Sequence, residues 1–436
     1  LFSKLFTMSP ERRILAYSNF HYITASDAEI FQYAKNDADK FNINAIIGFG
    51  NSGRALKYLS DCYQLDPANT VNAVLLGREV NKIEAEMNES FYLNSDSYTY
   101  YSRNEDKGDA KKYLDSVRTF ALQLYRDKKY VQPQLGLITA AYLSWINKEN
   151  TLAKEYLSEI NESDLNPKLV DQLQITRLLT QLTDWQNSKQ LDEIKLTQTL
   201  TWLEEKAKLD GKNDTRKPSW SYNAFEHSNY SLICRNILQN LVVKHYLNTQ
   251  DTAMASLAAV KADIFYNYGF AKDSLEENMQ WSTMHFWENS LTPKTLLKIR
   301  NLLTDNGQQQ TLSKFLLKDI KHFNRDYLTE LLGTTYLREL DFQKAAKTLA
   351  GLPKDHKKME IKNWYSEEQE DIKPNPFIVT INDYPKKYGS ESTTKLKYAE
   401  RMARLENALK TEKDNQKKAA YYFQMATGIY QTSTYG

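Results

Sequence analysis

The sequence predicts an all-α protein in which helical hairpins are stacked one after another and interrupted by a single extended insertion. Apolar residues recur at intervals of three and four along most of the chain, which is the period of an amphipathic helix. The 436 residues include only 14 glycines and 10 prolines, which are too few for a β-protein rich in tight turns. The breaks between periodic stretches are short, so successive helices are expected to pair.

The best-defined hairpin is Tyr327 to Pro353, where two short helices are expected to meet at Leu340 and Asp341. Gly333 and Ala345 carry little side chain, so the two helix axes can approach closely. Larger residues are expected to fill the space beside them: Tyr336, Phe342 and Leu349.

These positions resemble the tetratricopeptide repeat, whose pattern is a Leu-Gly pair, a Tyr, an aromatic after the turn, a small Ala and a terminating Pro. Pro353 comes about four residues before the ~34-residue period would place it. The resemblance implies a right-handed superhelical solenoid of such hairpins, because one hairpin cannot bury its own apolar face. The matching positions are Leu332, Gly333, Tyr336, Phe342 and Ala345, and, in an earlier hairpin, Ala55, Leu59, Cys62 and Pro67.

Other helices are predicted from the same period. Small residues stand where helices would touch at 135–160, 242–255 and 419–426, which predicts further hairpins there. The predicted helices are Pro10–Tyr33, Ala34–Phe49, Asn51–Leu65, Ala68–Ser90, Lys107–Tyr125, Leu135–Ile146, Thr151–Ile160, Lys168–Trp185, Leu191–Leu209, Tyr222–Leu247, Asp251–Tyr266, Lys272–Leu291, Pro293–Leu303, Gln308–Phe323, Thr394–Lys410 and Gln416–Tyr430.

Five parts follow from these segments. Residues 1–210 and 222–353 are expected to be runs of tetratricopeptide-like repeats, separated by a charged loop with Gly and Pro at 211–221. Residues 354–393 are expected to be extended, since two prolines precede a β-branched run and forbid a continued helix. Residues 394–436 are expected to form a last helical hairpin.

Composition limits the choice of partners. Lys and Arg number 57 against 55 Asp and Glu, so the net charge of +2 offers no field that would attract nucleic acid. No apolar run reaches the ~18 residues of a transmembrane helix. Cys62 and Cys234 can form at most one disulfide and do not identify the redox compartment.

No catalytic motif stands out, and the sequence predicts a non-catalytic protein with no cofactor and no metal. His285 and Glu288 lie three residues apart on one helix face, as in some di-metal carboxylate bundles. Zinc needs three or four ligands, however, and no second pair has matching spacing. Aromatic packing is the competing interpretation of this segment, through Trp281, Phe286 and Trp287.

Peptide capture is a further hypothesis, based on the family resemblance. Some tetratricopeptide domains hold the terminal carboxylate of a peptide with a Lys and an Asn one helical turn apart. Aligned through Ala55, Lys40 and Asn44 occupy those two positions, whereas Leu75 and Thr334 stand where further donors belong. The alternative is an ordinary Lys and Asn pair on a solvated helix face.

The final third of the chain has a second resemblance. The run NPFIVTIND at 375–383 and the tail ATGIYQTSTYG at 426–436 are similar to uncharacterised long tetratricopeptide-like envelope proteins of Bacteroidota. That group often carries a lipoprotein signal, which implies a periplasmic or outer-membrane lipoprotein, with the cytoplasm as the alternative. Residues 384–387 depart from the group, where a patch rich in Asp with Cys and His would be usual. The chain is expected to continue at both ends, with any lipid anchor before Leu1.

The sequence therefore predicts a scaffold that binds a protein or peptide partner on the concave surface of stacked repeats, within a bacterial envelope assembly. One alternative is a surface protein that binds glycans or nutrients, since seven Trp and 29 Tyr are present. A metal-dependent enzyme is the remaining alternative, and it depends on His285 and Glu288 alone.

Overall fold

The computed structural model confirms the all-α class, because helices account for all regular elements in the part of the chain that it describes and no β-strand occurs there. The described residues are 1–87, 107–188, 192–213, 229–266, 275–304, 311–320, 324–353, 376–377 and 393–435. They belong to two compact units, Leu1–Asp192 and Glu193–Gly436.

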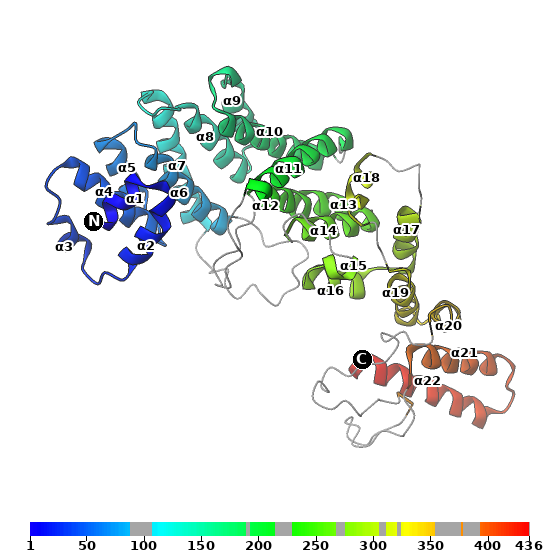
Figure 1. Cartoon of the computed structure of the whole chain (residues 1–436). Coiled ribbons are helices and arrows are strands. Elements are labelled where there is room, and N and C mark those ends of the chain that lie inside the picture. The colour runs from blue at the N-terminus through cyan, green and yellow to red at the C-terminus, as the bar shows by residue number, and fades with distance from the viewer. Residues whose placement is uncertain are drawn as a thin grey trace. The chain divides into compact units, whose positions relative to one another are not determined.

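In the first unit, consecutive helices pack against one another: α4 on α5, α7 on α8 and α8 on α9 (Figure 1). A helix that was not predicted, α1, precedes them and packs on α2 and α4. The elements are α1 (Phe2–Met8), a 3-10 turn (Pro10–Arg12), α2 (Arg13–His21), α3 (Asp27–Phe31), α4 (Asp37–Gly50), α5 (Leu56–Leu65), α6 (Val71–Met87), α7 (Lys107–Asp127), α8 (Gln134–Ile146), α9 (Asn150–Ser158), a second 3-10 turn (Glu162–Asp164) and α10 (Pro167–Ser188).

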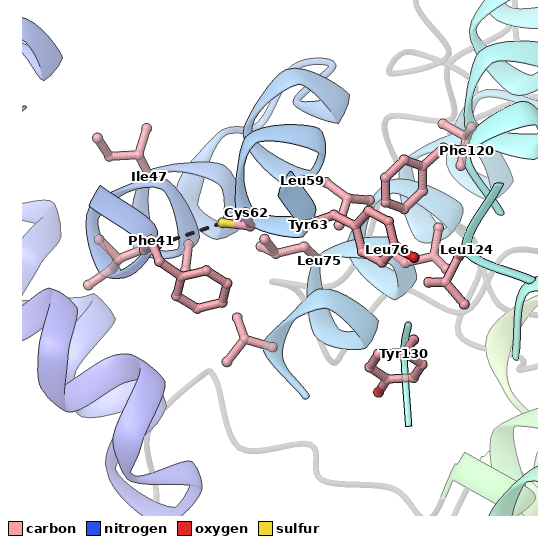
Figure 2. Packing of buried hydrophobic residues seen from close by; sticks show 14 of the residues in the cluster. Phe41, Ile47, Leu59, Cys62, Tyr63, Leu75, Leu76, Phe120, Leu124 and Tyr130 are labelled. Carbon is pink, nitrogen blue, oxygen red and sulfur yellow. Dashed lines mark hydrogen bonds between the residues drawn. The ribbon is translucent and has the colours of Figure 1, made fainter. Parts of the chain in front are cut away.

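The larger hydrophobic cluster of this unit includes α5. Figure 2 shows Cys62 directed at α4, where its thiol donates to the carbonyl oxygen of Phe41 at 3.7 Å. On the other side of α5, the ring of Tyr63 meets Phe120 of α7 edge to face, with centroids 5.5 Å apart. Both cysteines of the chain are free and buried, so no disulfide contributes to this core.

The second unit continues the pattern of packed neighbours, with α19 on α20, α20 on α21 and α21 on α22 (Figure 1). Its elements are α11 (Glu193–Asn213), α12 (Asn229–Ile237), a π-helical segment (Leu238–Val243), α13 (Lys244–Asn248), α14 (Thr252–Tyr266), α15 (Leu275–Asn278), α16 (Trp281–Ser290), α17 (Pro293–Thr304), α18 (Thr311–Leu317), α19 (Arg325–Arg338), α20 (Phe342–Leu349), α21 (Lys395–Thr411) and α22 (Asn415–Tyr435).

Three hairpins have turns of the same conformation. A non-glycine residue adopts the left-handed conformation after the first helix: φ is 65° at Lys148, 62° at Gln250 and 59° at Leu340. The next residue is acidic, and its N–H bonds to the carbonyl five positions earlier at 2.8 to 2.9 Å, which satisfies a helix end as in a Schellman motif. Four residues further on, each second helix has an alanine with no exposed surface, at positions 153, 255 and 345. The predicted hairpins at 135–160, 242–255 and 327–353 therefore have the same geometry.

Two predicted helices are divided. The predicted helix Pro10–Tyr33 stops at His21, and Ser26 starts α3 with a capping box in which its backbone N–H donates to the Glu29 carboxylate at 2.7 Å. The predicted helix Lys272–Leu291 is interrupted between α15 and α16, where the carboxylate of Asp263 accepts the N–H of Gln280 at 2.8 Å. The 3.6-residue period alone could not reveal either interruption.

The boundaries of the predicted loop and insertion are only partly described. Helix α11 runs through Asn213, so the loop expected at 211–221 does not begin at 211, and 214–221 lie outside the described residues. Of the insertion expected at 354–393, Pro376, Phe377 and Thr393 are described. Pro376 and Phe377 form a turn, and Phe377 packs on the α21–α22 pair, whereas the extended conformation expected for the rest stays a prediction.

Candidate functional site

Helix α17 has one buried face and an outer face that contributes side chains to a groove. It begins at Pro293, whose missing N–H is harmless in the first turn, and the Thr292 hydroxyl accepts the N–H of Thr295 at 3.2 Å. Leu296 and Ile299 face the core with 2% and 0% of their surface exposed. The outer face has residues at intervals of three and four: Lys294, Leu297, Lys298 and Asn301.

A groove of about 840 Å³ lies between this outer face and the α19–α20 hairpin. The hairpin contributes Tyr336 from α19, Glu339 from the turn and Lys344 from α20. Half-buried Leu297 and Leu302 of α17 and half-buried Tyr336 supply its apolar surface. Its size lies within the range of pockets that hold small ligands or a few residues of a peptide.

Carboxylates from the shared turns hold two lysines of the groove. The Lys298 ammonium lies 2.7 Å from the Asp251 carboxylate, and the Lys344 ammonium lies 2.8 Å from the Asp341 carboxylate. The hydrogen bond with Asp341 raises the pKa of Lys344, and the same contact lowers the pKa of Asp341. Lys344 also lies 5.6 Å from the ring centroid of Tyr336, within cation–π range.

The chemistry of this groove suits binding. Apolar side chains alternate with ammonium groups, an amide at Asn301 and a carboxylate at Glu339, so both an apolar side chain and the polar backbone of a peptide would find partners. Because the ammonium groups near Asp251 and Asp341 are already paired, the groove has little net charge and does not select strongly for one sign of ligand.

The predicted repeat positions are nearly all buried. Ala55, Leu59 and Cys62 are at most 3% exposed, and so are Phe342 and Ala345, while Leu332 is 5% exposed and Gly333 is buried. Pro67 and Tyr336 are half-buried. Tyr336 thus packs beside the hairpin, as predicted, and also forms part of the groove, a role that the sequence did not suggest.

The two residues proposed for peptide capture are not presented together. The Asn44 side chain is on the buried face of α4, where the residue is 5% exposed. Lys40 is exposed, and its ammonium lies 3.0 Å from the carboxylate of Asp37 on the same helix. Thr334, at the aligned Asn position of the hairpin 327–353, accepts a hydrogen bond from Lys395 of α21 at 3.0 Å. This geometry gives a carboxylate clamp at Lys40 and Asn44 no support.

His285 takes part in a ring contact. Its imidazole stacks on the indole of Trp281, with centroids 5.2 Å apart and an angle of 26°, while Glu288 is exposed one turn further along α16. Within the described ranges, no three His, Cys, Asp or Glu side chains are grouped so that they could hold a metal ion.

The sequence does not predict the groove, because its two walls are about forty positions apart along the chain. One local signal was available: the stripe from Lys294 to Asn301 alternates charged, apolar and amide side chains on the face opposite the buried Leu296 and Ile299. Which surface that stripe would face could be known only from the position of Tyr336 and Lys344.

Comparison with protein-family models, with curated proteins and with solved structures finds no match to this chain. Among the helices that the structure describes, none combines the length and the apolar character needed to cross a membrane.

Proposed function

We propose that this chain is a non-catalytic helical-repeat scaffold that binds an extended segment of a protein partner in the groove between α17 and the α19–α20 hairpin. The groove carries the proposal, because it combines an apolar floor with polar groups on both walls. The floor would take one apolar side chain of the segment. The Asn301 amide and the Glu339 carboxylate could bond to peptide N–H and carbonyl groups.

The shared turn of the three hairpins supports a repeat architecture. Lys148, Gln250 and Leu340 have the same place in their three turns. In each hairpin a fully buried alanine follows five residues later. Repetition of one supersecondary unit is the property of solenoids that provides long surfaces for partners. We therefore retain a tetratricopeptide-like right-handed solenoid as the proposed arrangement, and a bacterial envelope assembly as the proposed setting.

Selection of binding peptides from a random display library tests the groove. Peptides that bind the wild-type chain are expected to lose at least tenfold in affinity on Leu297→Asp, because a carboxylate would enter the apolar floor. Leu209→Asp is the matched control, since Leu209 is exposed on α11 and is absent from the groove lining. Equal binding by both variants, with unchanged circular dichroism, would refute the groove as the site.

A glycan-binding function is the second candidate, and Trp281 is the observation that favours it. This indole is 56% exposed and its stacking on His285 fixes the ring, which would cut the entropy lost when a sugar stacks on it. Binding of an oligosaccharide array by the wild-type chain, with loss on Trp281→Ala and no effect of Leu297→Asp, would favour this function over the scaffold.

A further inference from the structure

Phe377 occupies a socket on the α21–α22 pair. Its ring centroid lies 5.4 Å from that of Tyr398, and the guanidinium carbon of Arg401 lies 4.0 Å from the Phe377 centroid. Pro376, the preceding residue, is buried. The segment that contains this dipeptide thus has a defined seat on two helices that follow it in the sequence.

The socket is built from regular features of both helices. Arg401 and Met402 follow Tyr398 by three and four residues, so the three lie on one face of α21. Arg401 is held in place by a hydrogen bond of 3.0 Å from its guanidinium to the side-chain oxygen of Gln424 on α22. A guanidinium fixed in this way over a ring favours an aromatic occupant over an aliphatic one.

Gly428 makes room for the ring. A Cβ atom at this position would lie 2.9 Å from Cε1 of Phe377, 3.2 Å from Cε2 of Tyr398 and 3.4 Å from the sulfur of Met402. Glycine in the interior of a helix destabilises it relative to alanine. At position 428 the helix-destabilising effect of glycine is offset, because glycine leaves space for the aromatic ring of Phe377. Any larger residue would occupy that space.

Because Phe377 and its socket belong to the same chain, the binding of Phe377 to the socket is intramolecular. Residues 354–375 join it to α20 and residues 378–392 join it to α21. A group that belongs to the same chain as its binding site competes with a free ligand through its effective concentration at that site. A single aromatic anchor binds weakly on its own, so a free segment of the same kind can compete when its concentration is comparable.

We propose that the α21–α22 pair is a binding site for a proline–aromatic dipeptide, and that Pro376 and Phe377 are its resident ligand. The aromatic ring is selected by the Arg401 guanidinium over it and by the space at Gly428, and the proline is the buried residue that directly precedes the ring. This site is separate from the groove at α17. It assigns to the insertion a specific contact with the last hairpin.

Titration of a labelled synthetic peptide with the sequence of residues 373–381, KPNPFIVTI, tests the proposal in the full chain. Phe377→Ala empties the socket, so this variant is expected to bind the peptide. The wild type is expected to bind about tenfold more weakly, since its own Phe377 occupies the socket and must be displaced. The control peptide KPNPAIVTI is expected to bind neither protein measurably.

Two further variants in the Phe377→Ala background show whether the peptide binds in the socket or on another surface. Gly428→Leu fills the socket and is expected to abolish peptide binding. Arg401→Gln keeps a similar length and removes the cation, and is expected to weaken binding about threefold or more. Circular dichroism must show that each variant keeps its helices. Equal affinity of wild type and Phe377→Ala, equal affinity for the two peptides, or binding unaffected by Gly428→Leu would each overturn the proposal.

Discussion

Gly333 of α19 lies directly against Leu349 of α20: a Cβ atom at position 333 would be 2.4 Å from Cδ2 and 2.5 Å from Cγ of Leu349. Leu349 has no exposed surface, so its side chain cannot move aside without disturbing the core. The same device recurs at Gly48, where a Cβ atom would be 2.8 Å from Cβ of Tyr58 on α5. In at least two hairpins, therefore, the two helices pack closely at a glycine.

Gly333→Ala is expected to lower the free energy of unfolding by about 1 to 3 kcal/mol, because the added methyl group overpacks the hairpin. Urea denaturation followed by circular dichroism measures this. Adding Leu349→Ala to the same chain should produce a total loss smaller than the sum of the two single losses, since the methyl group would enter the vacated space.

Gly77→Ala is the control for that prediction. Gly77 is exposed inside α6, and a Cβ atom there would meet nothing within 4 Å. Alanine is expected to stabilise this helix by about 0.5 to 1 kcal/mol. A stabilising effect of the same size from Gly333→Ala would show that the two helices are not in close contact.

Leu340→Gly is expected to stabilise the chain by about 0.5 to 1 kcal/mol. The left-handed conformation of Leu340, with φ of 59°, costs a non-glycine residue about 1 to 2 kcal/mol, and the greater backbone entropy of glycine offsets part of the gain. Glu339→Gly is the matched control, since the preceding residue has φ of −83° and should lose stability. Thermal unfolding of both variants distinguishes these outcomes, and a lower melting temperature for Leu340→Gly would contradict the turn geometry.

Asp263 should make stability depend on pH. Burial raises its pKa from 3.8 to about 6, so the folded chain holds this proton more tightly than the unfolded chain does. Its contribution to the free energy of unfolding is therefore largest below pH 4 and falls as pH rises to about 6, by about 3 kcal/mol.

Asp263→Asn removes that titration. Relative to wild type, the variant is expected to gain about 3 kcal/mol between pH 4 and pH 7, in addition to any constant loss from the weaker bond to the N–H of Gln280. Urea unfolding at several pH values measures the difference, which largely cancels the titration of other groups. A difference that does not change with pH would show that Asp263 is ionised at pH 5 in the folded chain.

Lys261→Met is expected to destabilise the chain by about 3 to 5 kcal/mol. The Lys261 ammonium has no exposed surface and pairs with Glu204 at 3.2 Å and with Asp319, so its removal leaves carboxylates without their buried partner. Lys208→Met is the control, because that lysine is 48% exposed and lies 3.6 Å from Glu204, where a loss below about 1 kcal/mol is expected. Chemical denaturation of both variants tests this, and similar losses would contradict a special role for the buried ammonium.

Much of the candidate site was visible in the sequence only as separate parts. The sequence predicts Tyr336 as a packing residue and the helix Pro293–Leu303 to within one residue of α17, because both depend on local spacing. Alignment alone pairs Lys40 with Asn44, and it cannot predict the burial of Asn44, because the covered faces of α4 depend on its packing against α1, α5 and α6.

By itself, the sequence determined the all-α class, the positions of most helices and the small residues at which the helices of three hairpins touch. The contacts predicted at 419–426 are wrong, because Ala419, Phe423 and Ala426 are exposed on α22. These features follow from the 3.6-residue period and from side-chain size, which are local properties. Only the tertiary structure decided that Asp263 accepts the N–H of Gln280 just before α16, that α17 and the α19–α20 hairpin line a groove, and that Lys261 meets partners 57 and 58 positions away. Each of these depends on contacts between distant segments, and the free energy of such contacts is set by burial and geometry that no local pattern contains.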